Sequence, residues 1–248
     1  MAVQPKVVIL ILNYQKWKDT TECIQSLLKC NYSNYQIVIV DNDSQNESIS
    51  MIENTFPFIP IYRTHKNLGY TGGINFGMDK IVEYKPEYVL IINPDTIVTP
   101  DFLNHLVEGM ELCPSAAAAC GTIYHYQPNS KIWYAGGKMI PWRGLAVHNK
   151  SIPPLQTGEK FKYVTFVTGC MMLLRESVLP IIGKQDERFF LYLDDIEYSA
   201  RMMSKGYDLI YVPGSVIYHN WIDLDVSIYK LYYSVRNRLL LVDTSFKG

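Results

Sequence analysis

Short apolar runs alternate with helix-like segments along the first part of the chain, and this alternation constrains the fold more than any other feature. The runs are rich in Val and Ile, which favour strands that are covered on both faces. They lie at residues 6–12, 36–40, 59–63 and 88–92. Strand–helix alternation with short connections builds a parallel sheet from right-handed crossovers. The sequence therefore predicts an α/β fold with a mostly parallel central sheet flanked by helices.

Polar and glycine-rich segments separate these runs and predict the connecting helices. Asp19 suits the N-cap of the first helix. A short helix is expected at residues 48–56, and the glycine-rich segment 67–75 is expected to be a loop that enters the next helix. Thr99 and Pro100 suit the cap and the first position of a further helix.

The second half of the chain is less regular and predicts a smaller mixed region. Residues 120–155 are rich in aromatic residues, glycine and proline, which indicates hairpins and loops. Residues 164–175 are strand-like, a helix is expected to begin near Asp194, and a strand is expected at residues 208–212 with His219 just beyond it. No internal repeat or long linker is visible, so one domain is expected.

Residues 227–241 have the spacing of an amphipathic helix. Its apolar stripe consists of Ile228, Leu231, Val235 and Leu239. We expect this stripe to pack against the sheet, as amphipathic helices of globular domains do. Contact with a membrane surface is the alternative, because Lys230 and arginines accompany the stripe.

Charge and cysteine content exclude some classes of protein. The 23 basic and 24 acidic residues nearly cancel, which does not suit a general nucleic-acid binder. The five cysteines are odd in number and show no CxxC spacing, so reduced thiols in a cytoplasmic protein are expected. The apolar run at residues 7–12 is too short to span a bilayer, and no signal peptide precedes it.

The strand at residues 88–92 leads directly into Asn93, Pro94 and Asp95. Proline has no N–H for the ladder and ends the strand, which leaves the Asp95 carboxylate at the carboxyl edge of the sheet. Ligands bind at that edge in open α/β sheets, and a carboxylate there suits a metal ion that bridges to phosphate oxygens. An aspartate in a simple strand-exit turn is the alternative.

Asp41 and the glycines after residue 67 are candidates for nucleotide binding. Asp41 follows the second strand and could accept hydrogen bonds from a base or ribose, although an Asx turn accounts for it equally. Gly69 and Gly73 permit close approach of a ligand to the backbone, and a helix N-terminus favours anionic groups. The segment is not GxGxxG, and no glycine follows the first strand, so a dinucleotide site is disfavoured.

Two adjacent carboxylates, Asp194 and Asp195, follow the aromatic and apolar segment 189–193. Partial desolvation raises the pKa of a carboxyl group and makes it a better base toward a hydroxyl group. A helix start, where acids favour the positive end of the dipole, is the structural alternative. Glu197 is in register to pair with Arg201 four residues later.

Eight segments carry the recognisable features of the chain. In order along the chain they are VVILILNY, VDNDS, NLGYTGGINFG, YVLIINPDT, VTGCMMLLR, FFLYLDDIEYSARM, GYDLIYVPGSVIYH and YYSVRNRLLL. In this order and spacing they resemble the bacterial family 2 glycosyltransferases with the GT-A fold, and in particular their rhamnosyltransferase-like branch. The resemblance implies a single domain over residues 1–248. Residues 1–98 would bind the nucleotide-sugar, and residues 99–248 would bind the acceptor and carry out catalysis.

The resemblance also implies roles for individual residues. Asp195 would be the general base, and Asp95 and His219 would hold Mg²⁺ or Mn²⁺ against the diphosphate. Asn93 takes the place of the first acid of the family's DXD motif, so one charge toward the metal is missing. The remaining residues implied to bind substrate are Asn13, Asp41, Asn67, Gly69, Gly73, Asn93, Asp194 and Arg236.

The implied activity is a metal-dependent, inverting transfer of a sugar from a nucleotide diphosphate donor to a saccharide in cell-surface polysaccharide biosynthesis. The donor would be dTDP- or UDP-linked, with rhamnose as the first candidate sugar. The acceptor would be carried by a membrane lipid, which places the protein in the cytoplasm at the inner face of the cell membrane. A catalytically silent GT-A domain that binds nucleotide or glycan is the alternative.

Overall fold

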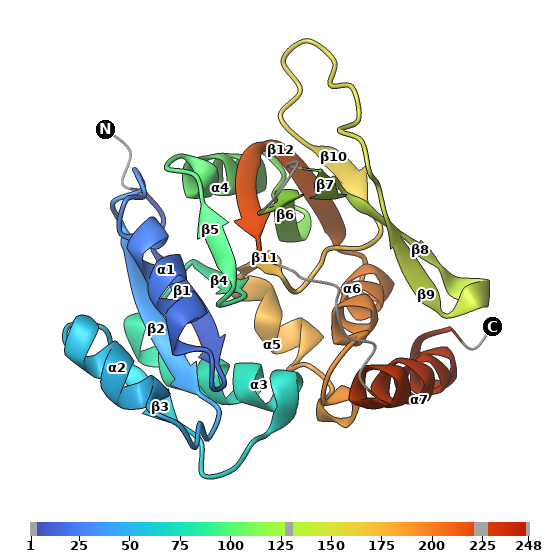
Figure 1. Cartoon of the computed structure of the whole chain (residues 1–248). Coiled ribbons are helices and arrows are strands. Elements are labelled where there is room, and N and C mark those ends of the chain that lie inside the picture. The colour runs from blue at the N-terminus through green and yellow to red at the C-terminus, as the bar shows by residue number, and fades with distance from the viewer. Residues whose placement is uncertain (1–3, 127–130, 221–227, 247–248) are drawn as a thin grey trace.

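The computed structural model describes residues 4–126, 131–220 and 228–246. Its centre is a ten-stranded sheet with the strand order β10-β12-β6-β11-β4-β1-β2-β3, and β5 and β7 pair with β12 and β6 (Figure 1). The strands that share one direction are β1 (Val7–Asn13), β2 (Tyr35–Asp41), β3 (Ile61–Arg63), β4 (Tyr88–Ile92), β6 (Ala116–His125) and β12 (Asp208–His219). The predicted mostly parallel sheet is therefore confirmed.

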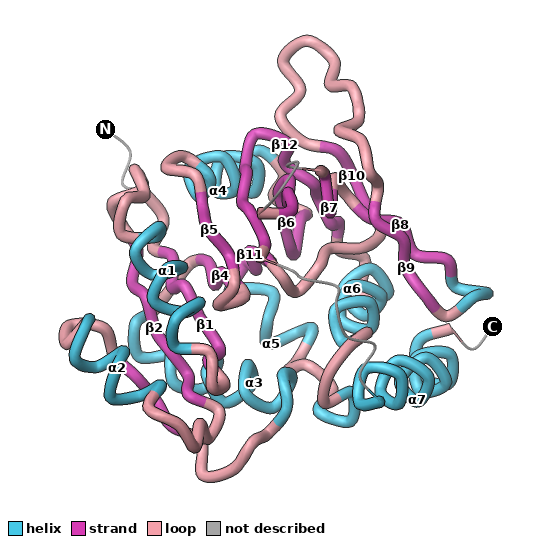
Figure 2. The backbone as a smooth tube through the Cα atoms, viewed as in Figure 1, coloured by secondary structure: helices cyan, strands magenta, loops and turns pink. Residues whose placement is uncertain are grey.

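The other strands interrupt this parallel arrangement. The strands that run against it are β5 (Thr96–Val98), β7 (Ile132–Tyr134), β10 (Lys162–Val164) and β11 (Met171–Arg175). A separate hairpin is formed by β8 (Gly137–Ile140) and β9 (Leu145–His148). Figure 2 shows this hairpin extending away from the main sheet toward the C-terminal helix.

Helices lie on both sides of the sheet and at its margin (Figures 1 and 2). They are α1 (Trp17–Leu27), α2 (Ser48–Thr55), α3 (Gly69–Ile81), α4 (Phe102–Leu112), α5 (Leu179–Ile182), α6 (Asp194–Ser204) and α7 (Ile228–Ser245). The core lies between these helices and the central strands, and every residue of β1 and β4 is buried. All five cysteines are free, as predicted.

The glycines of the segment 67–75 belong to α3 itself and not to a loop before it, which corrects the prediction. They allow α3 to lie close against the sheet. A Cβ atom on Gly73 would lie 2.5 Å from Leu12 Cδ1, and one on Gly77 would lie 2.7 Å from Leu10 Cδ1. Both distances are too short for real contacts, so these glycines serve helix–sheet packing.

Two predicted helix starts also differ from the structure. Asp19 lies inside the first turn of α1, and the N-cap residue is Lys16, which makes no side-chain capping bond. Helix α4 begins at Phe102 and not at Pro100. The reason is that Thr99 is held by β12, because its hydroxyl donates to the Val216 carbonyl at 2.9 Å.

The stripe predicted to pack against the sheet faces solvent instead. The exposed fraction is 85% for Ile228 and 71% for Leu239, whereas the buried residues of α7 are Asn237 and Leu241. The spacing of a helix defines a stripe but not which face is covered. Within the described residues, no helix combines the length and hydrophobicity needed to cross a membrane.

The parallel topology gathers several predicted site residues at one edge of the sheet. Asn13, Asp41 and His219 are the last residues of β1, β2 and β12, and Asp95 lies just beyond β4. His219 therefore ends its strand and does not lie beyond it, because β12 is longer than predicted. Strand β11 runs the opposite way, so the residues before it, including Gly169, also lie at this edge.

Candidate active site

A pocket of about 340 Å³ opens at this edge of the sheet. Its walls come from the end of β4, the residues before β11, the start of α6 and hairpin β8–β9 with the neighbouring strand β7. Predicted site residues in its lining are Asn93, Asp194, Asp195 and His219. The structure thus brings together predicted residues from three separate parts of the sequence.

The two carboxylates Asp194 and Asp195 begin α6, as predicted. The segment directly before them, residues 190–193, has a strained backbone. Phe190, Tyr192 and Leu193 all have positive φ, between 55° and 69°, which is uncommon for residues with large side chains. Such conformations cost of order 1–3 kcal/mol each and persist only where the surroundings hold them.

Asn237 of α7 holds this segment in place. Its side chain is completely buried, and its Nδ2 donates to the backbone carbonyls of Phe189, Leu191 and Tyr192 at 2.6, 2.7 and 2.8 Å. The resemblance to family 2 implies that Asn237, together with Arg236, supports the diphosphate or the acceptor. That role stays a prediction, and the contact that the structure shows is with the segment before α6. Helix α7 is thereby connected to the segment that precedes Asp194 and Asp195.

Gly69 supports the same segment from the other side. It has φ +74°, and a Cβ atom there would lie within 2.6 Å of Phe190 Cγ and of the Phe190 carbonyl oxygen. The predicted role of Gly69 was close approach of a ligand. The structure shows close approach of Phe190, so packing against the strained segment accounts for this glycine.

Asp195 has the environment of a base. Its Oδ2 accepts a hydrogen bond from the Gly169 N–H at 3.1 Å. Burial raises the pKa of Asp195 to about 6, although the Gly169 N–H acts in the opposite direction by favouring the charged form. Burial and the adjacent charge of Asp195 raise the pKa of Asp194 well above its ordinary value.

Asp95 and His219 lie side by side, with 3.1 Å between Asp95 Oδ1 and His219 Nε2. The Asp95 Oδ1 atom is buried and makes no hydrogen bond. His219 is 2% exposed, and its ring packs edge-on against Trp133 at 5.0 Å between centroids. The carboxylate oxygen of Asp95 and the imidazole nitrogen of His219 thus face each other.

This pair fits the predicted divalent cation as a partial site. A carboxylate oxygen and an imidazole nitrogen are both accepted by Mn²⁺, and Mg²⁺ usually takes one or two carboxylates and completes its shell with phosphate oxygens and water. No group of three or more His, Cys, Asp or Glu side chains suited to a metal occurs among the described residues. The donor set therefore suits an ion that is bound together with a diphosphate.

Asp41 and Asn13 lie at the same edge but are turned into the protein. Asp41 is 1% exposed, and its carboxylate accepts hydrogen bonds from Asn13 Nδ2 at 2.7 Å and from the Ser44 N–H at 2.9 Å. The hydroxyl of Thr20 donates to Asn13 Oδ1 at 2.8 Å. This is the turn-like arrangement that the sequence left open, and direct contact of Asp41 with a nucleoside stays a prediction that requires these bonds to rearrange.

Asn67 is exposed and stabilises the entry into α3. Its Oδ1 accepts from the Gly69 N–H at 2.8 Å and from Asn42 Nδ2 at 3.0 Å. The buried Asn42 also accepts from the Leu68 N–H at 2.9 Å. Asn67 is thus available to a ligand at the end of β2, whereas Asn42 fixes the backbone there.

The remaining predicted residue, Arg236, does not line the pocket. Its guanidinium lies over the ring of Tyr233 at 5.4 Å, and Tyr233 stacks on Phe190 at 5.1 Å. A role toward the diphosphate or acceptor stays a prediction. The predicted pair of Glu197 and Arg201 is present at 2.6 Å.

Trp133 and His148 line the pocket, and they belong to the region of residues 124–155, for which the sequence predicts no individual site residue. His148 Nδ1 lies 3.2 Å from the Trp133 carbonyl oxygen, so Nδ1 carries the hydrogen and Nε2 is an acceptor. Burial lowers the pKa of His148 to about 4, which keeps the ring neutral at pH 7. Aromatic faces and a neutral acceptor suit the apolar face and hydroxyl groups of a sugar.

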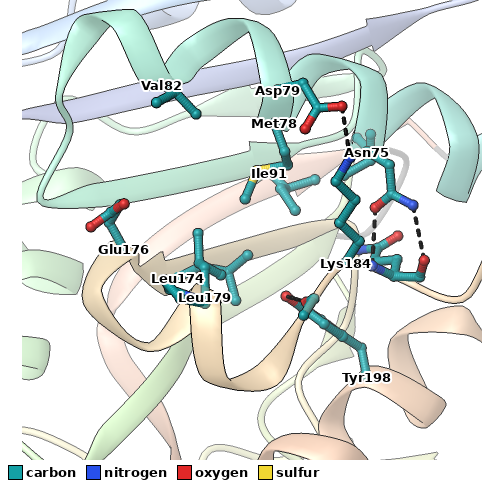
Figure 3. A pocket seen from close by; sticks show the side chains of 14 residues that line it. Asn75, Met78, Asp79, Val82, Ile91, Leu174, Glu176, Leu179, Lys184 and Tyr198 are labelled. Carbon is teal, nitrogen blue, oxygen red and sulfur yellow. Dashed lines mark hydrogen bonds and ion pairs between the residues drawn. The ribbon is translucent and has the colours of Figure 1, made fainter.

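A second cavity of about 320 Å³ lies away from the carboxylates, between α3 and α5 (Figure 3). Its lining is mainly apolar, and some of its polar groups are paired with one another. Lys184 Nζ lies 2.7 Å from Asp79 Oδ2, and Asn75 exchanges two hydrogen bonds with the backbone of Gln185. Nothing in this cavity suits the chemistry of the first pocket.

Comparison with known proteins identifies relatives of this chain. Over 208 residues, the chain is 22% identical to N-acetylglucosaminyl-diphospho-decaprenol L-rhamnosyltransferase of Mycobacterium tuberculosis, which covers 74% of this chain and 66% of that protein. It is 26% identical to the low-salt glycan biosynthesis hexosyltransferase Agl10 of Haloferax volcanii, over 96% of this chain and 76% of that protein. The chain thus spans about two-thirds to three-quarters of the length of these relatives.

Solved structures show the same fold. The structure of GalNAc-T7 with UDP, GalNAc and Mn²⁺ matches with a TM-score of 0.76 at 14% identity, over 98% of this chain and 48% of that chain. The fold is therefore GT-A. The model of glycosyl transferase family 2 matches residues 7–181. Because this match covers more than half of the chain, the chain belongs to glycosyl transferase family 2.

Proposed function

We propose that this chain is a metal-dependent, inverting glycosyltransferase that uses a nucleoside diphosphate sugar and a saccharide acceptor. The observation that carries the proposal is the position of Asp195. A carboxyl group with a pKa raised to about 6 shares one pocket with His219, which itself contacts Asp95. A base toward a hydroxyl group and a site for a leaving diphosphate therefore lie together.

These positions support the following reaction. The acceptor oxygen attacks the anomeric carbon and its proton passes to the Asp195 carboxylate, while the bond to the diphosphate oxygen breaks and the nucleoside diphosphate leaves. Asp195 belongs to α6, whereas Asp95 and His219 belong to the ends of β4 and β12. Base and leaving group on separate elements suit attack from opposite sides of the sugar, which inverts the anomeric configuration.

Asp95 and His219 would hold Mg²⁺ or Mn²⁺, which supplies positive charge for the diphosphate. Asn93 lies beside them and offers an amide without charge. Its backbone is fixed by the Cys170 carbonyl, which accepts from the Asn93 N–H at 3.0 Å. Two protein ligands in place of three imply that metal and nucleotide bind more tightly together than separately.

The names of the relatives support a choice of substrates. A dTDP- or UDP-linked sugar is the proposed donor, with rhamnose first, because one relative is named as a rhamnosyltransferase and one structural neighbour holds UDP. The name of that relative also describes an acceptor sugar on a diphospho-decaprenol lipid. We therefore propose a lipid-carried saccharide acceptor at the cytoplasmic face of the membrane, in cell-surface polysaccharide biosynthesis.

The test is nucleoside diphosphate release from a panel of dTDP- and UDP-sugars, with and without Mn²⁺, using saccharide acceptors. The proposal expects metal-dependent release and a product of inverted anomeric configuration, as measured by NMR. Nucleotide binding with metal but without turnover of any donor would favour the silent binding module instead.

A further inference from the structure

The outward face of α7 forms a continuous apolar surface. We name this surface the docking face, and it also includes Trp142 in the turn of hairpin β8–β9. Its members are Trp142, Ile228, Leu231, Tyr232, Val235, Leu239 and Val242. All are exposed, with Trp142 at 83% and Leu239 at 71%. A contiguous apolar surface of this kind marks an interaction site.

Hairpin and helix are joined, so the docking face is one surface. Arg238 Nε donates to the Arg143 carbonyl oxygen at 2.7 Å. A Cβ atom on Gly144 would lie 2.7 Å from Val242 Cγ2. Trp142 therefore stays beside the apolar stripe, as Figure 1 shows for the hairpin turn and α7.

Charge identifies the kind of partner. The basic residues on α7 are Lys230, Arg236 and Arg238, and Arg143 adjoins Trp142 in the hairpin turn. The only acidic residue within the described α7 is Asp243. This region is basic, although the whole chain has a formal charge of −1. Exposed Trp and Tyr beside arginines are typical of surfaces that lie at a membrane interface.

The docking face is continuous with the catalytic pocket. A groove along α7 is lined by Arg143, Val235 and Leu239, and it shares Leu193 and Ser234 with the pocket that contains Asp195. A lipid-carried sugar held at a membrane under α7 could therefore enter the pocket without leaving the bilayer surface.

We propose that the docking face binds an anionic lipid bilayer and so presents a lipid-carried acceptor to Asp195. The presentation of an acceptor rests on the proposed function, whereas binding to the bilayer does not. Each cation near an anionic membrane is worth about fivefold in binding, and burial of one leucine about tenfold or more.

The experiment is co-sedimentation of the full chain with vesicles, without donor or acceptor. Vesicles of phosphatidylcholine alone are compared with equal parts of phosphatidylcholine and phosphatidylglycerol. We expect binding to the anionic vesicles only, and weaker binding at high salt. Leu239→Gln should weaken binding about tenfold and Arg238→Gln about fivefold.

Matched variants elsewhere control for general effects of lost hydrophobicity or charge. Phe58 is 65% exposed far from α7 in the sequence, and Lys29 is exposed after α1. Phe58→Gln and Lys29→Gln should bind vesicles as the wild type does. Equal weakening by a control and its matched variant would overturn the inference, as would absence of wild-type binding.

A second copy of the chain is the competing partner for an apolar helix face. Size-exclusion chromatography that shows a dimer, which Leu239→Gln dissociates, together with no vesicle binding, would overturn the proposal in favour of self-association. Turnover of a water-soluble acceptor without vesicle binding would refute membrane binding by the docking face and leave the proposed function standing. Vesicle binding without any turnover would support the docking face and refute the proposed function.

Discussion

Asp195 combines a raised pKa with a fixed orientation. The Gly169 N–H holds one oxygen, and burial keeps the proton on the carboxyl group up to about pH 6. The base form is the deprotonated one, so kcat/KM, which reports the free enzyme, should fall as the pH decreases through about 6 and reach a plateau above it. The measurement is the pH dependence of kcat/KM for the acceptor at saturating donor. A flat profile between pH 5 and 8 would contradict this assignment.

The same pKa has a consequence for stability. A carboxyl group whose pKa rises from 3.8 unfolded to about 6 folded stabilises the fold below pH 4, and this contribution is lost as the pH rises through about 6. At pH 8, Asp195→Asn should therefore increase the free energy of unfolding, on the order of 1–3 kcal/mol. Urea denaturation at pH 8 and at pH 4 measures the change, which should vanish at the lower pH.

Asp95 and Asn93 should differ although they are two residues apart. Asp95 Oδ1 faces His219, whereas Asn93 carries no charge. Asp95→Ala should remove activity and its dependence on Mn²⁺ together, and Asn93→Ala should be milder. Initial rates over a series of Mn²⁺ concentrations measure both. Equal loss in the two variants would show that their roles are assigned wrongly.

At the scale of elements, α7 is predicted to hold the strained segment before Asp194 in place through Asn237. Asn237→Ala removes three hydrogen bonds to the strained segment and should lower the free energy of unfolding by about 2–3 kcal/mol. It should also lower kcat, because Asp195 follows that segment. Thr244→Ala, on the exposed side of the same helix, is the control and should change stability by less than about 0.5 kcal/mol.

Gly69 and Gly158 provide a matched pair for the other side of this segment. Both have positive φ, +74° and +83°, but Phe190 crowds Gly69 whereas nothing lies within 4 Å of Gly158. Gly158→Ala should cost about 1 kcal/mol of backbone strain. Gly69→Ala should cost more and reduce kcat, since Phe190 must move. If Gly69→Ala and Gly158→Ala changed kcat to a similar extent, contact with Phe190 would not explain the role of Gly69.

Strongly apolar elements were predictable from the sequence, and the faces of amphipathic ones were not. The parallel strands β1, β2 and β4 lie within one residue of their predicted ends, because each is a buried Val- and Ile-rich run. The stripe of α7 was assigned to the wrong face, since spacing does not say what covers it. Antiparallel β11 was also not foreseen as a neighbour of β4, because its pairing depends on long-range contacts.

The grouping of predicted residues was foreseeable at strand ends and not where packing decides. Asn93 and His219 line one pocket because β4 and β12 run in the same direction and end at one edge, and Asp195 reaches this pocket from the start of α6. Gly73 serves contact with Leu12, and Asp41 is bonded internally, so two positions expected to touch the ligand serve the scaffold in this structure. Residue type alone does not tell whether such a residue contacts a ligand or stabilises the fold.

For the whole molecule, binding of donor and metal should be coupled. With only Asp95 and His219 as protein ligands, the ion needs diphosphate oxygens to complete its shell. The melting temperature should rise more with a nucleoside diphosphate and Mn²⁺ together than the sum of the two separate increases. Differential scanning fluorimetry measures the shifts, and the same nucleoside without phosphates is the control. Additive shifts would argue against a shared site.

The central claim is that Asp195 acts as the base of a sugar transfer and is not needed for nucleotide binding. The most direct measurement compares wild type with Asp195→Asn for nucleoside diphosphate release, and for nucleoside diphosphate affinity with Mn²⁺ by calorimetry. We predict that the variant loses turnover by at least about a hundredfold, while its affinity stays unchanged. An active Asp195→Asn enzyme, or loss of turnover together with loss of nucleotide binding, would contradict the account.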